Sequence, residues 1–142
     1  MRLKANLSFE SLIQTFEEQR EHRYDEYQLR ELRQGYNDGL DISIYANAAF
    51  NNVQMHYIRL GLENNVDISK YAFVEYNYYV MAALYHLLKD GAYFDSYVLR
   101  DRLDIDKLVN DFDKLCSHKG LMCLDNWGRA TIEDGAPYYV KS

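Results

Sequence analysis

The sequence predicts a mainly α-helical protein. Tandem 26-residue helix-plus-short-helix repeats are expected first, followed by a winged-helix-like three-helix unit with a small C-terminal β-hairpin. Two observations predict this fold: apolar residues recur at helical spacing, and a long segment repeats itself. With 1 proline and 7 glycines among 142 residues, collagen-like and low-complexity chains are excluded. The 48% of hydrophobic and 27% of charged residues are typical of a globular chain. We expect two domains, 1–75 and 76–142, packed as one compact body.

An amphipathic helix is expected before the repeats. Ser8 is a suitable N-cap, and Phe9, Leu12, Ile13 and Phe16 then fall on one helical face.

The repeat itself is seen when LRQGYNDGLDISIYA (32–46) is aligned with IRLGLENNVDISKYA (58–72), at an offset of 26. Upstream, Asp25 with Gln28 aligns with Asn51 with Gln54. Asp or Asn followed three residues later by Gln has the spacing of a capping box, so a helix is predicted to begin after Asp25 and after Asn51.

Each unit contains a glycine inside its helix and a short second helix after it. Glycine inside a helix costs about 1 kcal/mol relative to alanine, so its repetition indicates close approach of another segment. Asp41 and Asp67 are expected to cap the short helices, whose Ile and Tyr fold back on the first helix. The positions expected to be equivalent and partly buried are Gly35 and Gly61, and Tyr45 and Tyr71.

Two further expectations follow from the alignment. A worn third copy begins at Tyr76-Asn77 and keeps the apolar spacing, but lacks the Arg, the Gly and the D-I-S-x-Y-A tail. The repeated Arg33 and Arg59 could present a basic pair to a phosphate or carboxylate. We favour the simpler interpretation that each arginine pairs with a nearby acid and packs its stem.

The repeat resembles units in proteins of phages and conjugative elements of Gram-positive bacteria, with the pattern Q-M-x-x-I-R-x-G-L-x-x-x-x-D-V-S-x-Y-A. Residues 54–72 carry this resemblance most closely and 28–46 more loosely. The resemblance implies an accessory protein of a mobile element. Some accessory genes of this kind lie near genes with anti-restriction functions. The resemblance implies no catalytic residue.

The second half is predicted to form three helices and a hairpin. The helices are NYYVMAALYHLLKDG, then YVLRDRL after Asp95 or Ser96, then DIDKLVNDFDKLCSHKG; LMCL and RATIE would form the hairpin, and PYYV a last short strand. This half resembles a winged helix-turn-helix domain. The residues that carry the resemblance are Leu99, Leu103, Ile105, Val109, Phe112, Leu115 and Gly120-Leu121-Met122.

The charge of the third predicted helix departs from that of DNA-binding members. Its outer face carries acidic residues, and the whole chain has 16 basic and 22 acidic residues, a net charge of −6. Because DNA carries about one phosphate charge per 1.7 Å of duplex, this face would be repelled, and tight nucleic-acid binding is not expected. A basic protein surface suits an acidic helix face better, although a solvated face without a partner is an equal alternative. The residues expected to bind a partner are Asp106, Asn110, Asp111 and Asp113, with Tyr93 and Tyr97 beside them.

Neither a catalytic motif nor a cofactor fingerprint is present, so we expect a protein that is not an enzyme. Cys116, His118 and Cys123 could supply three zinc ligands, but a closed site needs four, so reduced, partly buried thiols are the favoured interpretation. The N-terminus turns acidic where a signal peptide would be apolar, and the longest apolar-rich run, 76–88, is too short to span a bilayer. A cytoplasmic protein in a bacterial host cell is expected.

These observations lead to one functional hypothesis and two alternatives. The first is a small acidic mobile-element protein that binds and inhibits a host defence protein with a basic surface, with a CRISPR effector nuclease as the best single guess. The alternatives are a winged-helix DNA-binding regulator and a scaffold module without an inhibitory role. The sequence does not define an oligomeric state.

Overall fold

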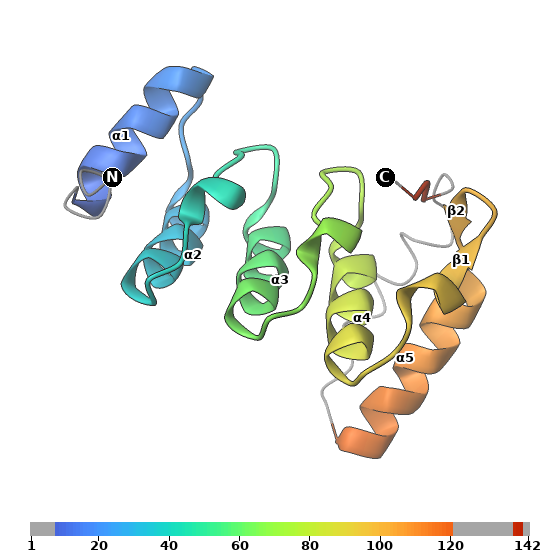
Figure 1. Ribbon diagram of the computed structural model, residues 1–142. Coiled ribbons are helices and arrows are strands. Elements are labelled where there is room, and N and C mark those ends of the chain that lie inside the picture. The colour runs from blue at the N-terminus through green and yellow to red at the C-terminus, as the bar shows by residue number, and fades with distance from the viewer. Residues whose placement is uncertain (1–7, 121–137, 141–142) are drawn as a thin grey trace. The chain divides into compact units, whose positions relative to one another are not determined.

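In the computed structural model, residues 8–120 and 138–140 are described (Figure 1). Within these residues the fold is mainly α, with five α-helices and a small two-stranded antiparallel hairpin. The chain divides into two compact units, Met1–Arg59 and Leu60–Ser142, so the division falls within helix α3. The boundary predicted after residue 75 marks a different point, the end of the second sequence repeat.

The first helix, α1 (Phe9–Arg20), begins where its cap predicts. The backbone N–H of Ser11 donates to Ser8 Oγ at 3.1 Å. Phe9 and Ile13 are buried, as expected for an amphipathic helix. Glu21 caps the C-terminal end of the helix and adopts a left-handed backbone with φ of 52°.

The next three helices follow one 26-residue period. Helices α2 (Glu26–Asn37), α3 (Asn52–Glu63) and α4 (Tyr78–Lys89) each have 12 residues and begin 26 residues apart. The 3₁₀ helices that follow them, η2 (Ile42–Ile44), η3 (Ile68–Lys70) and η4 (Phe94–Tyr97), also begin 26 residues apart. The third copy does lack the D-I-S-x-Y-A sequence, but η4 still forms a 3₁₀ helix at the place of that tail.

The predicted capping boxes of α2 and α3 are confirmed. Gln28 N–H donates to Asp25 Oδ1 at 2.7 Å, and Asp25 N–H donates to Gln28 Oε1 at 2.9 Å. The same two bonds between Asn51 and Gln54 are both 2.8 Å. The Gln28 amide also donates to the carbonyl of Phe50 at 2.7 Å. One buried glutamine thus starts its own helix and holds the residue before the next cap.

The repeated glycines lie directly under the repeated tyrosines. Tyr45 is fully buried and its hydroxyl donates to the carbonyl of Glu31 at 2.8 Å. A β-carbon on Gly35 would collide with this hydroxyl, and one on Gly61 would collide with the hydroxyl of Tyr71, which is also fully buried. The predicted equivalence of these positions is confirmed, and the rings are more deeply buried than expected.

In the third copy, a different residue stands at the position of the repeated glycine, and the repeated tyrosine has a different hydrogen-bond partner. Leu87 takes the place of the glycine and is buried, so the helix surface is already filled at this position. Tyr97, which takes the place of Tyr45, is buried too, but its hydroxyl donates to Asp111 of helix α5 (Ile105–Lys119) at 2.9 Å. In the second unit α4 packs against α5, where the Phe112 ring meets Tyr79 edge-on at 5.4 Å and stacks on His86 at 5.7 Å.

The prediction of a helix over YVLRDRL (97–103) was wrong beyond Tyr97, which is the last residue of η4. Strands β1 (Val98–Leu99) and β2 (Arg102–Leu103) form a hairpin there, with Val98 opposite Leu103 and Leu99 opposite Arg102. The physical reason is a partner distant in sequence: Leu103 N–H donates to the carbonyl of Tyr138 at 2.8 Å, which a short helix could not provide. The predicted last strand is represented by the bridge between Arg102 and Tyr139. The hairpin predicted after α5, in LMCL and RATIE, lies outside the described residues.

Every helix in the described part of the chain falls short of the length and apolarity that a bilayer span needs.

The tyrosine–glycine contact gives the first prediction. Gly35→Ala should destabilise the protein by about 1–3 kcal/mol, because overpacking outweighs the better helix propensity of alanine. Adding Tyr45→Phe removes the colliding hydroxyl, so the double variant should recover part of that loss. Urea unfolding of the four proteins measures the coupling energy, expected at about 0.5–3 kcal/mol. Strictly additive effects would show that the hydroxyl does not determine the need for glycine.

Candidate functional site

The predicted partner-binding residues separate into two groups. Asp106 and Asn110 of α5 are exposed, whereas Asp111 and Asp113 are half-buried. Asp111 accepts hydrogen bonds from Tyr97 and from Lys107 Nζ at 3.2 Å, and Asp113 accepts one from the Tyr79 hydroxyl at 3.4 Å. Both half-buried carboxylates therefore hold buried tyrosines in place and are not simply displayed on an outer face.

Asp111 and Tyr97 also change each other's acidity. Burial raises the pKa of the Tyr97 hydroxyl, and its hydrogen bond to the Asp111 carboxylate raises this pKa further. Burial alone would raise the pKa of Asp111, but the hydrogen bonds from Tyr97 and Lys107 outweigh it and leave the pKa below its ordinary value. The Lys107 ammonium lies 4.2 Å from the centre of the Tyr97 ring. These three groups fasten η4 to α5.

The position before each 3₁₀ helix has a defined role in the first two repeats. Asp41 Oδ1 accepts from the backbone N–H of Ser43 at 3.1 Å and from its hydroxyl at 2.6 Å. Asp67 makes the same two bonds to Ser69, at 3.1 and 2.6 Å. The hydroxyl bond from Ser69 is the main cause of a lowered pKa for Asp67. Both aspartates are true N-caps.

Tyr93 occupies this capping position in the third copy and does not cap. No side-chain hydrogen bond caps η4; the Tyr93 carbonyl instead accepts from the Ser96 N–H at 3.1 Å and hydroxyl at 2.6 Å. The Tyr93 side chain is 83% exposed, the highest value among the large hydrophobic residues that the structure describes. Asp95, two residues later, is exposed as well. The third copy has exchanged a stabilising cap for an aromatic ring in solvent.

The two repeated arginines pair with acids, as predicted. Arg33 Nη2 lies 2.6 Å from Glu10 Oε2, and these side chains are 52% and 71% exposed. The Arg33 guanidinium also lies 4.4 Å from the centre of the Phe9 ring. Arg59 Nε lies 3.0 Å from Glu31 Oε1, and here the side chains are only 10% and 18% exposed. One pair is therefore largely hydrated and the other largely buried.

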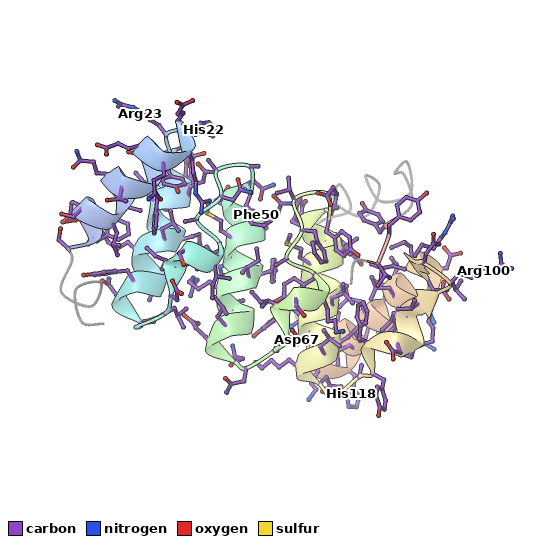
Figure 2. All side chains as sticks on the ribbon, turned by 45° about the horizontal axis from the view of Figure 1, so that its top comes forward. His22, Arg23, Phe50, Asp67, Arg100 and His118 are labelled. Carbon is purple, nitrogen blue, oxygen red and sulfur yellow. The ribbon has the colours of Figure 1, made fainter. Side chains whose placement is uncertain are left out.

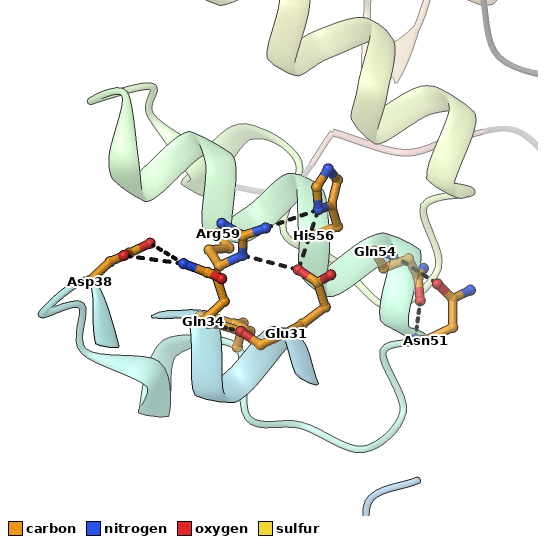
Figure 3. Close-up of polar contacts among 8 residues, drawn as sticks. Glu31, Gln34, Asp38, Asn51, Gln54, His56 and Arg59 are labelled. Carbon is orange, nitrogen blue, oxygen red and sulfur yellow. Dashed lines mark hydrogen bonds and ion pairs between the residues drawn. The ribbon is translucent and has the colours of Figure 1, made fainter. Parts of the chain in front are cut away.

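His56 joins the buried pair, an arrangement the sequence analysis missed (Figure 3). Its Nδ1 lies 3.1 Å from Arg59 Nη2 and 3.3 Å from Glu31 Oε1. A neutral ring can accept from Arg59 through Nδ1, or donate to Glu31 through a protonated Nδ1, but the same nitrogen cannot do both. The sequence pointed to only one member of this cluster. The repeat alignment marked Arg59, but Glu31 lies 28 residues away and His56 lies 3 residues away, and neither residue is repeated in the other copy.

The same cluster sets the acidity of Glu31. Burial tends to raise the pKa of its carboxyl, but the hydrogen bonds from His56 and Arg59, with their charges, bring the pKa below its ordinary value. Ionised Glu31 is thus favoured by folding, and this contribution to stability is present at neutral pH.

The possible zinc ligands are only partly described. Cys116 is buried and His118 is exposed at the end of α5 (Figure 2), whereas Cys123 lies outside the described residues. The described part of the chain contains no group of three His, Cys, Asp or Glu side chains placed to hold a metal ion.

Comparisons with other proteins found no matching family model, no matching curated protein and no matching solved structure.

The two arginine–glutamate pairs give the second prediction. Glu31→Gln should lower the free energy of unfolding at pH 7 by about 1–3 kcal/mol, since it weakens charged hydrogen bonds in a largely buried cluster. The loss should shrink as the pH falls through and below the depressed pKa of Glu31, because the wild-type carboxylate is then protonated as well. Chemical denaturation from pH 7 to pH 3 measures this.

Glu10→Gln is the matched control, since Glu10 forms the exposed version of the same pair. Its effect should stay below about 1 kcal/mol at pH 7. Equal losses in the two variants would contradict the assigned importance of the buried cluster.

Proposed function

We propose that this chain is a protein-binding module without a catalytic step, whose target presents a basic surface. The single observation that carries the proposal is Tyr93. At the equivalent positions of the first two repeats, aspartate caps a 3₁₀ helix, and an N-cap contributes about 0.5–2 kcal/mol to stability. A tyrosine that replaces this cap and is 83% exposed contributes no comparable stability to the folded chain. Exposed tyrosine is, however, a favoured anchor in protein interfaces.

Exposed carboxylates of the second unit support the kind of partner. Asp95 lies two residues after Tyr93, in the first turn of η4, and Asp106 lies in the first turn of α5; both are exposed. Exposed carboxylates favour a basic partner, chiefly by accelerating association. Of the residues expected at this interface, Tyr93, Asp106 and Asn110 keep that role in the proposal. Tyr97 and Asp111 support them by joining η4 to α5, and Asp113 does so by joining α5 to Tyr79 of α4.

The narrower proposal is inhibition of a host defence protein, with a CRISPR effector nuclease as the first candidate. The repeat's resemblance to mobile-element proteins supports it, as does the net charge of −6, which suits the basic channels in which nucleases hold nucleic acid. Such a protein would act in the cytoplasm of a bacterial host. A winged-helix regulator is not favoured, because residues 98–103 form a hairpin where that fold needs its middle helix.

The third prediction separates binding from stability at Tyr93. Tyr93→Asn should restore a cap and raise the free energy of unfolding by about 0.5–1 kcal/mol. The same variant should weaken binding to the target by about 2 kcal/mol or more if the ring is an interface anchor. Thermal unfolding and surface plasmon resonance measure the two effects. Tyr27→Asn, at a 52% exposed tyrosine of α2, should leave binding unchanged. Unaltered binding by the Tyr93 variant would remove the main support for the proposal.

The fourth prediction identifies the target class. Plasmid cleavage by a panel of purified RNA-guided effector nucleases should be inhibited for at least one member when this protein is added. Asp106→Lys should slow association and reduce its salt dependence, because it removes a favourable long-range charge. Glu26→Lys is the matched control, since Glu26 also lies in the first turn of a helix.

Inhibition of no panel member would contradict the CRISPR assignment. If a pull-down from lysate also recovers no basic protein, the scaffold alternative becomes the better explanation. Submicromolar binding to duplex DNA with a steep salt dependence would instead favour the regulator.

A further inference from the structure

A second departure from the repeat pattern lies in the segment that follows η4. In the first two copies, a short loop leads from the 3₁₀ helix to the next cap, Asn51 or Asn77. In the third copy this segment forms the β1–β2 hairpin, and the next cap, Asp104, comes one residue later than the 26-residue period requires. The inserted residue and the hairpin therefore interrupt a pattern that the chain otherwise follows closely.

The hairpin aligns three exposed side chains in one row. Leu99 is paired with Arg102, and Arg102 is bridged to Tyr139 on its other side, so the three lie side by side across the strands. Leu99 is 56% exposed, the Arg102 side chain 50% and Tyr139 50%. The neighbouring row, Leu103 and Tyr138, is buried. Successive residues of a strand face opposite sides, so this small sheet has one buried and one exposed face.

The exposed row has the composition of a binding surface. The Arg102 guanidinium lies 5.6 Å from the centre of the Tyr139 ring, which orients the guanidinium and leaves half of it in water. Tyrosine and arginine are the side chains that dominate interface energies, and the adjacent leucine adds exposed apolar area.

The turn of the hairpin adds a second cation. Arg100 has φ of 62°, in the left-handed region that a residue with a β-carbon rarely adopts. Figure 2 shows its side chain extending away from the ribbon. Asp101, which lies 3.5 Å from Arg102, is the acid between the two arginines, while the Asp104 carboxylate accepts the Lys107 N–H at the start of α5. The exposed face thus presents two arginines with one carboxylate between them, in a chain whose total charge is −6.

We propose that the exposed face of this sheet, formed by Leu99, Arg102 and Tyr139 with Arg100 at the turn, binds an acidic segment of a partner protein that also carries apolar side chains. Carboxylates of that segment would pair with Arg100 and Arg102, and its apolar side chains would cover Leu99 and the Tyr139 ring. The apolar side chains decide the partner. An acidic protein segment offers carboxylates for the two arginines together with apolar side chains for Leu99 and Tyr139, whereas a phosphate backbone offers only the charge. This surface is opposite in charge to the one proposed around Tyr93 and does not depend on it.

The probe for this proposal is a short fluorescein-labelled peptide in which leucines are flanked by glutamates. Fluorescence anisotropy should show saturable binding that weakens as salt is raised. Amide chemical-shift changes in the ¹⁵N-labelled protein should centre on Leu99, Arg102 and Tyr139. Arg102→Glu should weaken binding about tenfold or more, and Leu99→Ser, which leaves the charges unaltered, should weaken it several-fold.

A matched control lies in the first unit. Arg30 stacks on the exposed Tyr27 at the same 5.6 Å, but the pair belongs to no hairpin row. Arg30→Glu should therefore leave peptide binding unchanged, and circular dichroism confirms that each variant is folded.

Equal weakening by Arg30→Glu and Arg102→Glu would overturn the proposal, since binding would then follow only the overall charge. Unchanged binding in both the Arg102 and the Leu99 variants would overturn it as well. Displacement of the peptide by a single-stranded oligonucleotide at lower concentration than unlabelled peptide would show that the face selects phosphate, which would also reject the acidic protein segment.

Discussion

The local fold of each of the first two repeats depends on a tyrosine hydroxyl seated over a glycine. The contact turns a 3₁₀ helix back onto the α-helix that precedes it, and a β-carbon at Gly35 or Gly61 would collide with the tyrosine hydroxyl. The isoleucine of the same short helix is held there too, with Ile42 Cγ2 3.0 Å from the position of a Gly35 β-carbon. Because a buried hydroxyl needs a partner, the bond from Tyr45 to the Glu31 carbonyl makes the contact specific in direction as well as in space.

This constraint explains which parts of the fold the sequence could predict. Capping boxes, helix-interior glycines and cap aspartates act over a few residues, so their spacing was sufficient for α2, α3, η2 and η3. The hairpin depends on backbone bonds to Tyr138 and Val140, far along the chain, and the local pattern of residues 97–103 fitted a helix equally well. The 3₁₀ helix of the third copy was not predicted, because the D-I-S-x-Y-A sequence is lost there. Tyr97 nevertheless keeps its position in the repeat, with Asp111 as its hydrogen-bond partner.

The candidate site was predictable to a similar extent. Helical spacing correctly placed Asp106 and Asn110 at the surface, because exposure on a helix follows its period. It could not show that Asp111 and Asp113 accept bonds from tyrosines on other elements, since those partners are set by tertiary packing. Tyr93 stood out only when its position was compared with Asp41 and Asp67. A repeat provides an internal reference of this kind: where one copy gives up a stabilising residue, a purpose other than stability is indicated.

The bond from Leu103 to Tyr138 has a consequence for the order of folding. The bonds of Tyr45 and Gln28 in the first repeat join residues 14 and 22 positions apart, and contacts of short range form quickly, even while a chain is still being synthesised. The bonds from Leu103 N–H to Tyr138 and from Val140 N–H to Asp101 close a longer loop and must wait until residue 140 has left the ribosome. The row of Leu99, Arg102 and Tyr139 is therefore completed last. An incompletely synthesised chain can hold folded repeats and yet present an unfinished sheet edge, which leaves this hairpin open to misassembly or proteolysis until synthesis is complete.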